Sequence, residues 1–124
     1  MIEQKLGIIN GTFLGHSGQG IFGFALHIDY GSSGQGFGPY CLSHRPDGGT
    51  EIYNPLIGEA IGKICAAVGV SCWENLKGQT VYVGRDTDTN ALVSIEAPPF
   101  VQHGPAYNII DHLGQDGEGA IVHD

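Results

Sequence analysis

An alternating pattern over residues 20–30 constrains the fold of this chain more than any other feature. Phe22, Phe24, Leu26 and Ile28 fall on one face of an extended strand, while small or polar residues occupy the other face. A glycine-rich run follows directly, with four glycines in residues 31–38. Glycine reaches positive φ without steric penalty, so the chain can reverse direction there. The pattern therefore predicts a strand with one buried face that ends in a tight connection.

The glycine-rich run, residues 29–40, has two interpretations. Its backbone N–H groups can converge in a concavity that binds an anion. Alternatively, the run is a hairpin connection and nothing more. In the first case, neighbouring aromatic, hydroxyl and amide side chains, together with two later arginines, complete a site for a nucleotide-like ligand. The candidate binding residues are Tyr30, Ser32, Ser33, Gln35, Tyr40, Arg45 and Arg85.

Several further segments carry strand or turn patterns. Strands are expected at residues 5–14, 39–42, 79–85 and 91–96, with the last two joined as a hairpin. The connecting residues 86–90 are rich in side chains that bond their own backbone. Residues 107–113 fit a last edge strand or a helical turn. Together with the segment discussed next, these patterns predict a single α+β domain over residues 1–124, with an antiparallel sheet of about five strands.

One main helix is expected to pack on this sheet. Asn54 and Pro55 give a helix start signal, and apolar residues recur at helical spacing until Gly69, which is placed to end the helix. Gly58 and Gly62 lie in its interior and cost roughly 1 kcal/mol each relative to alanine. This cost predicts a close approach of the helix to the sheet or to a twin helix. We accordingly expect a homo-oligomer.

The charge balance narrows the class of partner. The 124 residues carry 13 Asp and Glu against five Lys and Arg, giving a net charge of −8. So few cations argue against direct binding to nucleic acid, which rests on neutralising phosphates. The acidity suits a protein that docks on a basic surface, with a cluster of carboxylates near the C-terminus. These are Asp111, Asp116, Glu118 and Asp124.

The cysteines and the hydropathy indicate a compartment. Cys41, Cys65 and Cys72 form no CxxC pair, and the odd number favours a reducing environment. No apolar run approaches the roughly 18 residues that a membrane span requires. The N-terminal residues do not resemble a targeting peptide. We therefore expect a cytoplasmic protein without membrane contact.

Catalytic and metal-binding chemistry has little support in the sequence. His27 and Asp29 share one face of a strand and are candidates to begin a metal site, with His16 or His44 as a third ligand. The competing interpretation is a hydrogen-bonded surface pair. We expect no cofactor.

The sequence also contains two conceivable nucleophile arrangements. Ser32 or Ser33 beside His27 and Asp29 would form a triad, but no GxSxG elbow is present. Cys41 and His44 form a second imaginable dyad. Neither pattern is specific, so we expect a binding protein rather than an enzyme, with a small metal-dependent hydrolase as the least favoured alternative.

Two strings of residues resemble a family of small phage and prophage accessory proteins. The first runs from Thr12-Phe13-Leu14-Gly15 through Gly20-Ile21-Phe22 and Leu26–Gly31 to Gln35-Gly36-Phe37-Gly38 and Tyr40. The second is Val68-Gly69-Val70-Ser71-Cys72-Trp73-Glu74-Asn75-Leu76-Lys77-Gly78, followed by Val81 and Val83. The chain departs from the family pattern at Gln19, Ile28 and Ser32. Ser32 replaces a glycine and narrows the backbone freedom of the loop.

The resemblance implies a counter-defence function. Accessory phage genes include anti-CRISPR inhibitors and sponges that sequester nucleotide immune signals. We therefore expect a phage-encoded protein that sequesters a small nucleotide-type signal in the host cytoplasm. The alternative is a protein–protein inhibitor that docks on a host defence nuclease through an acidic surface.

Overall fold

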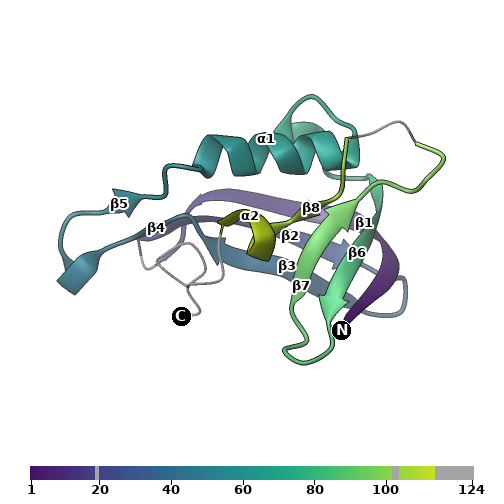
Figure 1. The fold of residues 1–124 in the computed structure, drawn as a ribbon, viewed down its shortest axis with the longest axis horizontal. Helices are drawn as coiled ribbons and strands as arrows, with labels where there is room; N and C mark the ends of the chain where they lie inside the picture. Colours follow the sequence, from purple (N-terminus) through teal and green to yellow (C-terminus); the bar gives the residue numbers. More distant parts are fainter. Residues whose placement is uncertain (19, 102–103, 114–124) are drawn as a thin grey trace.

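The computed structural model describes residues 1–18, 20–101 and 104–113 of the chain. It has a mixed α+β fold in which a six-stranded antiparallel sheet packs against one main helix, α1 (Ile57–Val68) (Figure 1). The predicted fold class is confirmed, with slightly more strands than the five or so expected. The additional strand is β8 (Tyr107–Asn108). It lies in the segment for which the sequence is compatible with either an edge strand or a helical turn.

The strands of the main sheet lie in the order β3-β2-β1-β6-β7-β8. The bounds of the five longer strands are β1 (Ile2–His16), β2 (Phe22–Asp29), β3 (Gly34–Cys41), β6 (Thr80–Asp86) and β7 (Leu92–Glu96). A separate two-stranded sheet pairs β4 (Ser43–His44) with β5 (Ile52–Tyr53). The remaining elements are the short helix α2 (Ile109–Leu113) and the 3-10 turns Pro46–Gly48 and Trp73–Asn75.

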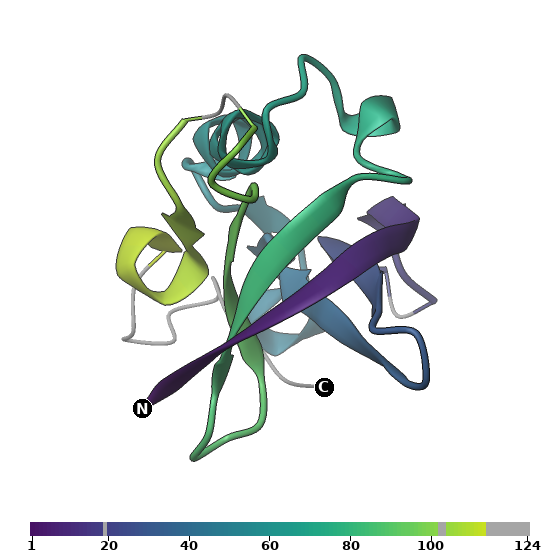
Figure 2. The same cartoon turned by 90° about the vertical axis from the view of Figure 1, so that its right-hand side faces the viewer.

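The long strand β1 joins the two halves of the sheet. Residues 2–8 pair with β6, residues 8–16 pair with β2, and a β-bulge shifts the register between Ile9 and Gly11. The sheet curls, as Figure 2 shows, and brings β3 into contact with β7 although these strands are not paired. Across this contact the Tyr40 hydroxyl donates a hydrogen bond to the Leu92 carbonyl.

The core lies between the concave side of the sheet and α1. Phe24, Leu26 and Ile28 are fully buried, which confirms the predicted core face of this strand, while Phe22 at its end is only partly buried. The Phe24 ring contacts Tyr40 and Trp73 with centroid separations of 5.9 Å in both cases. Burial of such large apolar and aromatic side chains is the main source of stability for a chain of this size.

The C-terminal end of α1 follows the local signal in the sequence, whereas the helix begins two residues later than Asn54 and Pro55 predict, with Leu56 at the N-cap and no side-chain cap. The Asn54 side chain accepts a hydrogen bond from the Leu56 N–H at 2.8 Å, just before the first helical turn. Gly69 adopts a left-handed φ of 94° and closes the helix with an N–H to Cys65 carbonyl bond of 2.8 Å. Neither this helix nor any other in the described ranges is long and apolar enough to cross a membrane.

The prediction that Gly58 and Gly62 allow a close approach to the sheet is wrong, whereas an approach to a twin helix stays a prediction. Both residues are exposed, and a Cβ atom built on either glycine meets no other atom within 4 Å. The helix instead contacts the sheet through its other side, where Ala60, Ile64 and Ala67 are fully buried. The two glycines thus lie on the side of α1 that faces away from the core.

Candidate functional site

The glycine-rich run forms a hairpin between β2 and β3. The Tyr30 N–H donates to the Ser33 carbonyl at 2.8 Å, and the Gly31 N–H donates to Asp29 Oδ1 at 2.7 Å. From Gly34 onward the chain pairs with β2. The hairpin interpretation is therefore confirmed, because the turn and the pairing with β2 engage part of this backbone. Binding of an anion by the remaining N–H groups of residues 31–38 stays a prediction.

Side chains from distant parts of the chain meet next to this hairpin. The Tyr30 hydroxyl donates to Gln35 Oε1 at 3.1 Å, and Gln35 Nε2 donates to the Asn90 carbonyl at 2.5 Å. Arg85 Nη1 donates to Asn90 Oδ1 at 2.6 Å. Lys5 Nζ lies 4.3 Å from the centroid of the Tyr30 ring, in a cation–π contact. We call this group the Tyr30 cluster; its members are Glu3, Lys5, Tyr30, Gln35, Arg85 and Asn90.

Two of the chain's five Lys and Arg side chains belong to the Tyr30 cluster. Arg85 donates to Glu3 Oε1 through Nε at 2.9 Å and Nη2 at 2.5 Å. This hydrogen bonding lowers the pKa of the Glu3 carboxyl below its ordinary value, so the carboxylate is ionised at neutral pH. Desolvation raises the pKa of the Tyr30 hydroxyl, which therefore remains a hydrogen-bond donor.

The other predicted binding residues lie elsewhere. Ser32 and Ser33 are exposed at the tip of the hairpin. Tyr40 is buried, and desolvation raises the pKa of its hydroxyl to about 12. Arg45 follows β4, beyond the opposite end of β3, and its guanidinium donates to the carbonyls of Gly20 and Gly49. The structure thus brings together only Tyr30, Gln35 and Arg85 of the seven candidates.

His27 and Asp29 do not bond each other directly. Asn10 lies between them, because its Oδ1 is hydrogen-bonded to His27 Nδ1 and its Nδ2 lies 3.5 Å from Asp29 Oδ2. The β-bulge beside Asn10 in β1 accounts for its position here, which the strand pattern alone does not indicate. Within residues 1–18, 20–101 and 104–113, no group of three or more His, Cys, Asp and Glu is placed to hold a metal ion.

A second polar network centres on Glu51, which the sequence did not single out. Its side chain is only 10% exposed. Glu51 Oε2 accepts hydrogen bonds from the Ser43 hydroxyl at 2.5 Å and the Phe22 N–H at 3.2 Å. Glu51 Oε1 lies 2.9 Å from His16 Nε2 and accepts from the Tyr53 hydroxyl at 3.1 Å.

These contacts set the charge state of Glu51. The hydrogen bond from Ser43, assisted by those from His16, the Phe22 N–H and Tyr53, outweighs desolvation and lowers the pKa of Glu51 to about 2. A carboxylate with so low a pKa is a poor general base at neutral pH. Glu51 therefore joins β5 to β1, β2 and β4 as an ionised hydrogen-bond acceptor.

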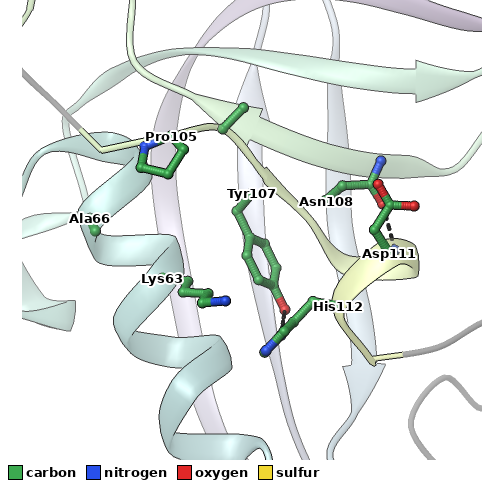
Figure 3. Close-up of a pocket in the computed structure, with 8 residues that line it drawn as sticks. Lys63, Ala66, Pro105, Tyr107, Asn108, Asp111 and His112 are labelled. Carbon is green, nitrogen blue, oxygen red and sulfur yellow. Dashed lines mark hydrogen bonds between the residues drawn. The ribbon is translucent and has the colours of Figure 1, made fainter.

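A cavity of about 370 Å³ lies between α1 and the segment at residues 105–112 (Figure 3). At its wall the Tyr107 hydroxyl lies 3.0 Å from His112 Nδ1, and His112 Nε2 lies 3.3 Å from Glu59 Oε1. Glu59 also pairs with Lys63 at 3.2 Å. The contacts with His112 and Lys63 lower the pKa of Glu59. The Glu59–His112 ion pair links α1 to α2, but His112 Nε2 is buried and makes no hydrogen bond within the described residues. No motif in the sequence indicates the arrangement.

Comparison with protein-family models, curated proteins and solved structures gave no match to this chain. The resemblance to phage accessory proteins and the expected homo-oligomer therefore stay predictions. Of the acidic cluster near the C-terminus, only Asp111 lies within the described residues, where it is exposed on α2.

Proposed function

We propose that this protein acts by binding, and that it takes up a small phosphate-bearing ligand of nucleotide type at the Tyr30 cluster. The observation that carries the proposal is the long-range convergence of Tyr30, Gln35 and Arg85 with Lys5. In a chain with a net charge of −8, two cations beside an aromatic ring provide a local site for an anion.

The ion pair between Arg85 and Glu3 suggests how a phosphate would enter. The Glu3 side chain is 50% exposed, whereas that of Arg85 is 24% exposed, so the carboxylate can turn into solvent while the guanidinium stays in place. A phosphate oxygen then takes the position of Glu3 Oε1 on Nε and Nη2 of Arg85. The Gln35 amide and the Tyr30 hydroxyl supply hydrogen-bonding groups for the rest of the ligand.

Sequestration is the function that such binding would serve in a phage protein. The resemblance of the sequence to phage accessory proteins supports such a context. A protein that holds an immune nucleotide without converting it keeps that nucleotide away from its receptor. The polar side chains of the Tyr30 cluster are already bonded to one another, which favours a preorganised binding site.

Native mass spectrometry and calorimetry with cyclic mononucleotides, cyclic dinucleotides and ADP-ribose test the proposal. We expect at least one of these compounds to be retained unchanged, and Arg85→Gln to weaken its binding at least tenfold. Arg45→Gln is the matched control, because Arg45 lies beyond the far end of β3 from the Tyr30 cluster. Equal effects of the two substitutions, or no binding across the panel, would contradict the proposal.

A further inference from the structure

The convex face of the main sheet carries a strip of half-exposed apolar side chains. Four of them come from β1: Ile2, Leu6, Ile8 and Phe13, with exposed fractions of 46, 53, 47 and 46%. Val81 and Val83 of β6 are fully buried on the concave face, so the alternate residues of β6 and their partners in β1 project outward. In Figure 2, β1 (purple) and β6 (green) cross the front of the molecule with no helix over them.

The edge of this apolar strip is acidic. Directly opposed residues of antiparallel strands project to the same face. The register places Asp86 opposite Ile2 and Asp29 opposite Ile8. Tyr82, which is opposite Leu6, has Glu96 as its partner on the other side. Three carboxylates therefore border the part of the strip that contains Ile2, Leu6 and Ile8.

No Lys or Arg of the main sheet balances these carboxylates. Lys5 and Arg85 are the only Lys or Arg residues in its strands, and their register partners Val83 and Glu3 place them on the concave face. The ion pairs within the described residues use Glu3, Glu51 and Glu59, and none uses Asp29, Asp86 or Glu96. The convex face thus combines uncompensated negative charge with exposed apolar area.

We propose that the convex face docks on a basic protein surface, one with an apolar centre and a border of lysines or arginines. Contiguous exposed apolar side chains with a polar border are typical of protein interfaces. Charge complementarity selects the partner, because a second copy of this chain would set three carboxylates against three others. Nucleic acid is disfavoured for the same reason. This surface is distinct from the Tyr30 cluster, so it adds a protein partner to the proposed ligand.

Site-specific photo-crosslinking in bacterial cytosol provides the first part of the test. p-Benzoylphenylalanine is introduced at Leu6 on the convex face and at Gly62 on α1 as the control position. We expect cross-links from position 6 to a protein whose cross-linked peptide comes from a lysine- or arginine-rich surface. Cross-links only to a second copy of this chain, cross-links to a surface without excess positive charge, or none beyond the level at position 62 would overturn the proposal.

The second part uses the purified cross-linked partner and calorimetry. We expect Leu6→Ser to weaken binding at least tenfold, and Glu96→Gln to weaken it about threefold. Ile52→Ser is the matched control, because Ile52 of β5 is exposed to 48% and lies outside the convex strip. Affinity should also fall as NaCl rises from 50 to 300 mM. Equal losses for Leu6→Ser and Ile52→Ser, or binding that is insensitive to both Glu96→Gln and salt, would overturn the proposal.

Discussion

Arg85 contacts Glu3 through two nitrogens that converge on one oxygen, with Nε 2.9 Å and Nη2 2.5 Å from Glu3 Oε1. The residues are 82 positions apart in the sequence and meet because β1 pairs with β6 in antiparallel register. Glu3 thus accepts hydrogen bonds from Nε and Nη2 of Arg85, the two groups that an incoming phosphate would bind. In the proposed function this carboxylate is a competitor of the ligand.

Removing the Glu3 charge should therefore strengthen ligand binding. We expect Glu3→Gln to raise the affinity for the retained nucleotide about two- to fivefold, since the competing exposed ion pair is of modest strength. Isothermal titration at neutral pH and low salt measures the change. Glu59→Gln on α1 removes one negative charge outside the cluster and separates the local effect from that of net charge. An affinity that is unchanged or lower in Glu3→Gln would count against an anion site at Arg85.

The C-terminal end of α1 was predictable, and its start was predictable to within two residues, because the signals at both ends are local. Asn54 and Gly69 act on neighbouring backbone groups, whatever the rest of the fold does. The β6–β7 hairpin is similar, because Asp86 Oδ1 accepts the Asp88 N–H at 2.8 Å within the expected turn. Periodicity also identified the buried face of β2. These features depend on a few adjacent residues and not on the course of the whole chain.

The site was only partly predictable, because its geometry depends on long-range pairing. The side-chain types of Tyr30, Gln35 and Arg85 made them candidates from the sequence. The curl of the sheet brings these residues together, and no local sequence pattern indicates that curl. Phe37 and Tyr40 are both buried despite an odd spacing, since the register shifts in β3 between them. Gly38 lies at this shift with a φ of 97°, which favours glycine.

Alanine at the exposed helical glycines should stabilise the fold. Gly58→Ala and Gly62→Ala each place a methyl group in open space, and each should raise the free energy of unfolding by about 0.5–1 kcal/mol. Urea denaturation measures the gain as a higher midpoint with an unchanged slope. Gly23→Ala should have the opposite effect, because its Cβ would lie 2.5 Å from the Tyr40 carbonyl oxygen. A loss of stability in Gly62→Ala would indicate a contact at this side of α1.

The contact of β3 with β7 should depend on the Tyr40 hydroxyl. Tyr40→Phe leaves the Leu92 carbonyl without this donor and should lower the free energy of unfolding by about 1 kcal/mol. Chemical denaturation measures this cost. Tyr82→Phe, which removes a hydroxyl from the convex face, is the control and should have a smaller effect. Equal costs for the two substitutions would show that the hydrogen bond to Leu92 adds nothing to stability.

The Glu51 network should make stability depend on pH in the acidic range. Its folded-state pKa of about 2 lies below the ordinary carboxyl value of 4.5, so the folded protein binds the proton less readily than the unfolded chain. The resulting stabilisation is fully present above the ordinary pKa and is lost as the pH falls from about 4.5 towards 2. We expect Glu51→Gln to lower the Tm at pH 7, and the difference from the unmodified protein to narrow as the pH approaches 2. Thermal unfolding followed by circular dichroism across this range measures the difference, with Glu74→Gln at an exposed position as the control. A Tm difference that stays constant with pH would show that the charge of Glu51 is not what stabilises the junction of β5 with β1 and β2.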